Sequence, residues 1–233
     1  MKPLHIILVA ISTVAASHAA TVTWSAAIDT GLADASGTPL AQNNWLQIGY
    51  FATLSNAQIA ADASSRSGMS ALVADFRVFA STQVGANTGA PGTFAQGSSP
   101  LYSSLPVGFA NSQIYFWALD STDVSSLSAA ENTATAQAIG YLPKAADSNW
   151  QFPATDTSPP GGSTIDVNAL VNGTMLAGTY QSVGGAAMDQ IFGSGSHSVQ
   201  LAPVVSPVPE PATVGFGLLT ILAAAGVRTR RRA

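Results

Sequence analysis

The side chains that could act as a nucleophile, base or acid are few in this chain and show no catalytic spacing. Of its 3 histidines, only His197 lies outside the first 18 residues. A Ser-His-Asp hydrolase would need this histidine as its base. No Gly-x-Ser-x-Gly elbow accompanies it, because Gly193-Ser194-Gly195 is too short and lies next to the histidine. We interpret His197 as an exposed loop residue and expect that the protein is not an enzyme.

Carboxylates and metal ligands are equally sparse. Glu131 is the only glutamate between the two ends of the chain, and no pair of acids has the spacing of a glycosidase, which stays a third alternative. Without cysteine and with one histidine in the body, zinc is not expected. Asp120-Ser121-Thr122-Asp123 could offer oxygen ligands to calcium, but it follows no calcium-loop pattern, so a solvated turn is favoured. The sequence therefore predicts no metal and no cofactor.

Three tryptophans offer a different chemistry, the stacking of flat rings on sugars. They are Trp45, Trp117 and Trp150. In a domain with few aromatic residues such rings are more often part of the core, because they bury large apolar areas. A carbohydrate-binding module that acts on exopolysaccharide is the alternative function that an exposed set would support.

The most specific pattern lies at the C-terminal end. Pro209-Glu210-Pro211 precedes an uncharged apolar run over residues 212–227, and a basic tail over 228–233 follows. As a helix the run would be about 24 Å long, slightly short for a bilayer core of about 30 Å. The tail would be retained on the cytoplasmic side, which places the body outside. Its retaining residues are Arg228, Arg230, Arg231 and Arg232.

This order of motif, apolar helix and basic cluster resembles the PEP-CTERM sorting signal of Gram-negative bacteria over residues 209–233. The resemblance implies that an exosortase, a membrane protease-transpeptidase, reads Pro209, Glu210 and Pro211 and cuts near them. It also implies transient residence in the inner membrane and a host that makes exopolysaccharide, a further possible partner. An ordinary stop-transfer anchor is the plainer alternative for the same residues.

The N-terminal end is typical of a secretory signal peptide over residues 1–19. Lys2 precedes an apolar run at 4–11 that is too short to span a bilayer, and Ser17 and Ala19 are the small residues that a signal peptidase reads. A buried N-terminal element is the alternative. Both ends together predict an exported protein that is first an inner-membrane intermediate and then reaches the cell surface or extracellular matrix.

The charge of the body excludes one class of partner. Between the two terminal signals, Arg66, Arg77 and Lys144 are the only basic residues, against eleven acidic ones. Nucleic-acid binding requires clustered lysine and arginine, so we expect no nucleic-acid partner. Cysteine is absent, and stability cannot come from disulfides.

The elements of the body are predicted to be mainly β, as a β-sandwich with one or two short helices. Alternating or apolar segments predict strands at 21–28, 45–51, 74–79, 114–119, 164–170, 178–183 and 198–205. Capping-box patterns at residues 55–58 and 128–131, each followed by alanine-rich sequence, predict the helices. The expected domain spans 20–202, and residues 203–208 form a proline-rich spacer.

Three aromatic segments add a weaker resemblance. The segments 45–51, 113–118 and 148–153 are similar in layout to uncharacterised PEP-CTERM proteins of the Verrucomicrobia type. This resemblance implies no activity. The expected role of the body is structural or adhesive.

Overall fold

The computed structural model describes residues 21–26, 31–96, 108–143, 145–147, 150–152, 162–167, 170, 173–182 and 197–205. Ser17 and Ala19, the motif 209–211, the apolar run and the arginine cluster lie outside these ranges. Within them, none of the helices has the length and apolar character needed to cross a membrane.

The described chain is mainly β, as predicted, and it carries the helices α1 (Asn56–Asp62), α2 (Arg66–Asp75) and α3 (Leu127–Thr133). The strands are β1 (Thr21–Ala26), β2 (Leu32–Ala33), β3 (Trp45–Phe51), β4 (Phe76–Gln83), β5 (Phe94–Gln96), β6 (Tyr115–Ser121), β7 (Ala134–Tyr141), β8 (Gly162–Asp166), β9 (Thr174–Ala177), β10 (Thr179–Ser182), β11 (His197–Gln200) and β12 (Ala202–Pro203).

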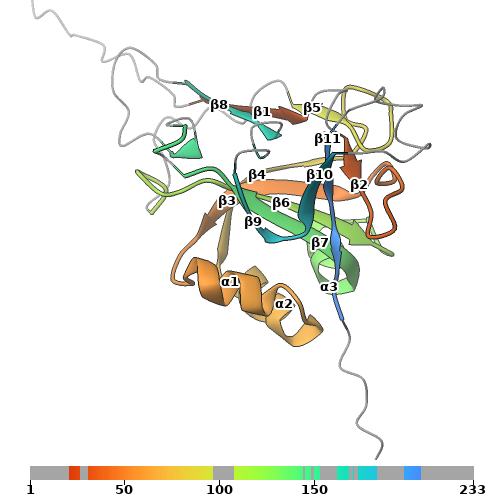
Figure 1. The fold of residues 1–233 in the computed structure, drawn as a ribbon, viewed down its shortest axis with the longest axis horizontal. Coiled ribbons are helices and arrows are strands. Elements are labelled where there is room, and N and C mark those ends of the chain that lie inside the picture. Colours follow the sequence, from red (N-terminus) through yellow and green to blue (C-terminus); the bar gives the residue numbers. More distant parts are fainter. Residues whose placement is uncertain are drawn as a thin grey trace, which may run out of the picture.

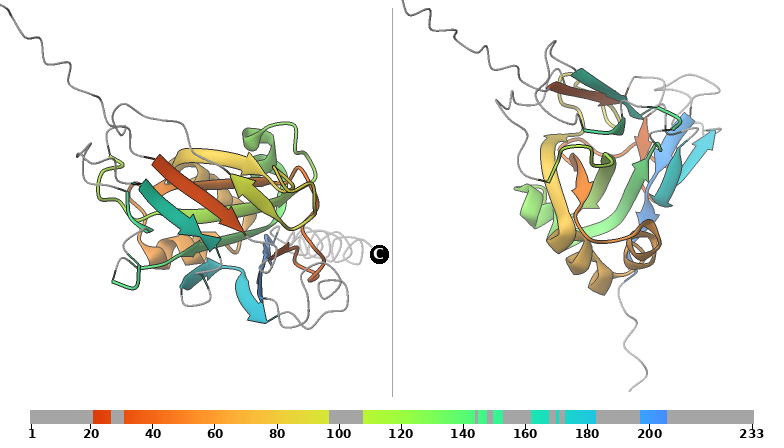
Figure 2. Two further views of the ribbon diagram at one scale, coloured as in Figure 1. Left: turned by 90° about the horizontal axis from the view of Figure 1, so that it is seen from above. Right: turned by 90° about the vertical axis from the view of Figure 1, so that its left-hand side faces the viewer.

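A six-stranded sheet forms the middle of the molecule (Figure 1). Its strand order is β12-β7-β6-β3-β4, and β9 also pairs with β7. The three helices lie on one side of this sheet, and the small sheet β5-β1-β8 lies on the other side (Figure 2). The second small sheet, β10-β11-β2, flanks it. The body therefore has two cores, one on each face of the central sheet.

Strand β6 contributes to both cores in alternation. Phe116 and Ala118 belong to the cluster that includes Trp24 of β1 and Phe94 of β5. Trp117 and Leu119 belong to the cluster beneath the helices. Successive side chains of a strand point to opposite faces, so a strand covered on both sides must be apolar at every position. This explains the uninterrupted apolar run that predicted the strand.

The first predicted capping box is confirmed, and the second is wrong. Ser55 caps α1 by accepting a hydrogen bond from the Gln58 backbone, and the Gln58 side chain accepts one from the Ser55 backbone. Helix α3 begins two residues before the predicted position, because Ser126 caps it through the Ala129 backbone N–H. Ser126 and Ser128 are both of a residue type that is favoured at a helix N-cap, but only Ser126 occupies that position.

Two boundaries between helix and strand differ from the sequence prediction. The segment 74–79 was predicted as strand, but its first two residues end α2, and β4 begins at Phe76. The alanine-rich sequence after α3 favoured helix and instead forms β7, which is buried along most of its length. The described part of the body has three helices, one more than the one or two expected there. Long-range pairing overrides the local alanine preference at β7.

Glycine allows α1 and α2 to meet closely. Gly68 lies in the first turn of α2, and a Cβ atom built on it would be 2.2 Å from the carbonyl oxygen of Asp62 at the end of α1. No side chain fits at that distance. The α1–α2 turn, residues 63–66, can therefore be short and tight.

Candidate functional site

The candidate functional site lies around residues 202–205, beside the helix layer. Strand β12 pairs with β7 at the edge of the central sheet, with Ala202 opposite Gln137. The backbone of Val204 then donates to the Thr135 carbonyl at 2.8 Å. The expected spacer begins at residue 203, so the structure extends the body into it, up to Val205.

Val205 is held by the α1–α2 turn rather than by the sheet. Its backbone N–H donates to the Ser64 carbonyl at 3.2 Å, and its carbonyl accepts from the Arg66 N–H at 3.1 Å. These bonds form a parallel bridge between Val205 and Ser65. The side chain itself is 56% exposed, so backbone pairing holds this residue. We call residues 202–205 with their partners the C-terminal clasp.

The α1–α2 turn is in turn fixed from beneath by a buried amide. Gln137 of β7 donates through Nε2 to the Ala63 carbonyl at 2.7 Å, and its Oε1 accepts from the indole nitrogen of Trp117 at 2.8 Å. Both Gln137 and Trp117 are fully buried. A buried amide with its donor and acceptor both used orders the groups around it, because leaving either group unpaired costs free energy.

Arg66 joins the same turn to the end of α3. Its guanidinium donates to the Asn132 carbonyl at 3.1 Å and to the Ala134 carbonyl. These are carbonyls at the C-terminal end of a helix, which otherwise lack partners, and a positive charge there also interacts favourably with the helix dipole. The side chain of Arg66 therefore has a structural role already.

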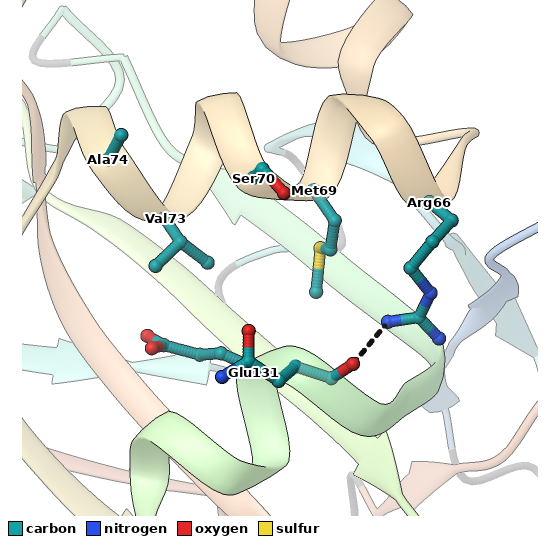
Figure 3. A pocket seen from close by; sticks show the side chains of 7 residues that line it. Arg66, Met69, Ser70, Val73, Ala74 and Glu131 are labelled. Carbon is teal, nitrogen blue, oxygen red and sulfur yellow. Dashed lines mark hydrogen bonds between the residues drawn. The ribbon is translucent and has the colours of Figure 1, made fainter.

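A groove of about 220 Å³ lies between α2 and α3 and starts at Arg66 (Figure 3). Met69 and Val73 of α2 point toward α3 on the opposite side, where Glu131 lies (Figure 3). The remaining lining residues are Ser70, Ala74 and Asn132. The groove is therefore bordered by one cation and one carboxylate, and it opens next to the clasp.

Glu131 extends from this groove toward the central sheet. The amide nitrogen of Gln47, a fully buried residue of β3, donates to Glu131 Oε1 at 3.3 Å. Burial raises the pKa of Glu131, and the hydrogen bond from Gln47 offsets only part of this. The side-chain oxygen of Gln47 is buried and has no hydrogen-bond partner in the described part of the chain. If the Gln47 amide were rotated by 180°, its Oε1 would face Glu131. A protonated Glu131 carboxyl could then donate a hydrogen bond to that oxygen.

A second cavity, of about 400 Å³, lies at the C-terminal end of β3. Its aromatic walls are Tyr50, Phe51 and Tyr115, and Ser112 and Gln113 add polar atoms. Gly108 leaves room for the Tyr50 hydroxyl, since a Cβ atom there would be 2.1 Å from that oxygen. The Tyr50 hydroxyl has no hydrogen-bond partner among the described residues.

The three tryptophans do not form a stacking platform. Trp117 and Trp150 have 0% exposure, so neither presents a ring face to solvent. Trp45 is half-buried, and its indole nitrogen donates to the Val124 carbonyl at 3.0 Å. The rings that cover the second cavity are tyrosines and a phenylalanine instead, which the sequence analysis did not single out.

Among the described residues, no three histidine, aspartate or glutamate side chains lie close enough together to bind a metal ion. In the segment 120–123, Asp123 accepts a hydrogen bond from the Ser125 backbone at 2.9 Å, as in a turn. Burial, followed by the charge of Asp34, raises the pKa of Asp120. His197 begins β11, opposite Ser182, so its assignment to a loop was wrong.

No protein-family model, curated protein or solved structure matches this chain. Only the residues of the chain itself therefore indicate its function.

The clasp was predicted only in part. The predicted strand at 198–205 covers its residues, but the proline-rich composition after Leu201 is typical of a spacer, and the expected domain ended at residue 202. In the structure Val204 is buried, at 7% exposed. The bonds to Ser64, Arg66 and Thr135 are formed by backbone atoms, so no side-chain pattern pointed to these partners.

Proposed function

We propose that this chain is an exported surface or extracellular-matrix protein, structural or adhesive and without catalytic activity, which an exosortase sorts through its C-terminal tail. The observation that carries the proposal is the order of parts in the tail. Pro209-Glu210-Pro211 is followed directly by an uncharged run and then by four arginines within the last six residues. The expected host is a Gram-negative bacterium that makes exopolysaccharide, with the inner membrane as a transient site.

The organisation of the body is consistent with tail processing. The buried hydrophobic residues of the described chain run from Trp24 to Val204. Removal of a leader before residue 20 and cleavage near residue 209 would leave all of them in the mature protein. The body would then keep both of its cores after processing.

We further propose that the body is a β-sandwich with an added helix layer. In this interpretation the central sheet packs against the two small sheets through the cluster that includes Trp24, Phe94 and Phe116. The stacked rings of Phe94 and Phe116, with centroids 6.2 Å apart, would lie between the two layers. A compact body of this kind suits a matrix component, because its surface needs no moving part.

Replacement of the sorting motif tests this proposal. In a host with an exosortase, a variant with Pro209, Glu210 and Pro211 changed to alanine should accumulate uncleaved in the inner membrane, while the unchanged chain is shortened and reaches the surface. Pro207→Ala is the matched control, because it removes a nearby proline outside the motif. Cell fractionation and mass spectrometry of the mature C-terminus give the readout. Equal shortening of the triple variant would make the tail an ordinary anchor.

Glycan binding is the second candidate function, and the cavity beside Tyr50 favours it. Aromatic rings are suited to a neutral sugar when they lie beside amide and hydroxyl groups and carry a hydroxyl that, like that of Tyr50, has no partner among the described residues. The probe is the exopolysaccharide of the host, titrated into the purified body and followed by calorimetry. Binding that Tyr50→Ala abolishes, and that Tyr180→Ala leaves unchanged, would support this function. Unchanged binding by the Tyr50 variant would exclude the cavity.

A further inference from the structure

The clasp limits how far the sorting motif can move from the body. Val205 is fixed by backbone bonds to Ser64 and Arg66, and Pro209 follows it by four positions. An extended chain advances by at most about 3.6 Å per residue. The covalent chain therefore allows at most about 14 Å between the Cα atoms of Val205 and Pro209.

With this limit, an enzyme that binds the motif would approach the body from one particular face. Val205 is hydrogen-bonded to the α1–α2 turn, and α1 and α2 belong to the helix layer (Figure 1). Strand β1, where the described chain begins, lies in the layer on the other side of the central sheet (Figure 2). A membrane-embedded enzyme that reads the motif would meet the helices first. A folded domain attached by so short a connection cannot turn its opposite face to the same enzyme.

The surface around the clasp carries mostly short side chains. Its exposed positions include Ala60, Ala61, Ser64, Ser67 and Ser70, together with Gln58 on α1. Two charged residues lie here: Arg66 uses its guanidinium for the end of α3, and Asp62, the last residue of α1, is half-buried. Short neutral side chains allow another surface to approach closely, and the Asp62 carboxylate would have to stay at the edge of such a contact or meet a cation there.

We propose that the α1–α2 turn and the start of α2 face the membrane and form part of the surface that the processing protease contacts, with the clasp setting the distance between body and motif. This inference rests on the proposed function. It adds that the body is oriented during processing, whereas a long flexible spacer would leave it free to rotate. Processing should then depend on the length of the connection and hardly at all on its sequence.

Spacer length is the direct test. Deletion of residues 206–208 should bring the body against the protease and reduce the rate of tail shortening by about tenfold or more, because small misplacement of a reacting group is costly. Replacement of the same three residues by Gly-Ser-Gly should keep the original rate. Thermal unfolding of each purified variant checks that the fold of the described body, residues up to 205, is unchanged.

The possible outcomes separate this inference from the proposed function. If the triple-alanine variant is blocked while the deletion variant is shortened at the original rate, the sorting function stands and the orientation inference fails. If the Gly-Ser-Gly variant is as slow as the deletion, spacer sequence determines processing and the inference also fails. If the triple-alanine variant is shortened normally, the proposed function itself fails.

Site-specific photo-crosslinking gives an independent measurement. A crosslinking amino acid at Ala61, exposed on α1, should capture the exosortase when the active-site variant of that enzyme traps the complex. The matched position is Asn87, which is exposed and lies in the loop that is hydrogen-bonded to β5 on the other side of the sheet. Equal capture from both positions would overturn a fixed orientation.

Discussion

The indole nitrogen of Trp117 donates a 2.8 Å hydrogen bond to Oε1 of Gln137, and both side chains are fully buried. This pair connects the central sheet to the helix layer, because the same amide donates to the Ala63 carbonyl at the end of α1. One polar side chain thereby fixes a core tryptophan and the turn that holds the C-terminal clasp.

Gln137→Ala should lower the free energy of unfolding by about 2–4 kcal/mol, since it leaves a buried indole N–H and a buried carbonyl without partners. Urea unfolding followed by tryptophan fluorescence measures the change. Gln83→Ala is the control: its amide also bonds a backbone carbonyl, that of Asn43, but in an exposed place. The control should cost less than about 1 kcal/mol. Similar losses in both variants would contradict the role assigned to the buried pair.

Glu131 should make the body less stable as pH rises. Burial raises the pKa of this carboxyl above its usual value of 4.5, so protonation is favoured in the folded state. Its contribution is complete below the unfolded pKa and is lost as pH increases through the folded pKa. Glu131→Gln should remove this dependence and raise stability at neutral pH by up to about 1 kcal/mol, because the new amide can donate to Gln47 Oε1. If the free energy of unfolding depends on pH in the same way for both proteins between acidic and neutral pH, this effect of Glu131 is excluded.

Asp75 should act in the opposite direction. Burial alone would raise its pKa, but hydrogen bonds from the side chain and backbone of Thr53 and from the backbone of Leu54 outweigh it, and the pKa falls below the usual 3.8. Its contribution is present above the unfolded pKa and is lost as pH falls through the folded pKa.

Asp75→Asn should therefore cost about 1 kcal/mol at neutral pH and nothing in strong acid, where the native carboxyl is protonated too. Thermal unfolding at a series of pH values gives the readout. A loss that is the same at neutral and strongly acidic pH would show that the charge of the carboxylate is not what stabilises the segment before α1.

The body should fold without its tail. Residues 20–205 contain every described core residue and the complete clasp, and we expect one cooperative unfolding transition. A shorter chain that ends at residue 201 lacks β12 and the buried side chain of Val204. It should therefore unfold at a lower temperature. Calorimetry of the two proteins compares them directly. A broad transition in the longer chain would contradict an autonomous body, and equal melting temperatures would contradict a stabilising role for residues 202–205.

Several elements could be predicted from sequence because their signals are local. The predicted strand at 45–51 coincides with β3, and the capping box at Ser55 and Gln58 marks the start of α1. The targeting segments at both ends are also read from local order of charge and apolar residues, and they stay predictions. Each of these patterns is contained within a few neighbouring residues, where propensity and capping act.

Only the tertiary structure decided which face each tryptophan occupies, that the alanine-rich β7 is a strand, and that Val205 is held by the α1–α2 turn. In each case the deciding partner is far away in sequence: Gln137 bonds Trp117 and Ala63, and Ser64 bonds Val205. An alanine-rich stretch satisfies helix rules until neighbouring strands supply a ladder on both sides. The predicted strand at 198–205 covers the clasp, but its backbone bonds depend on no particular side chain, so the sequence carries no pattern that identifies the α1–α2 turn as the partner.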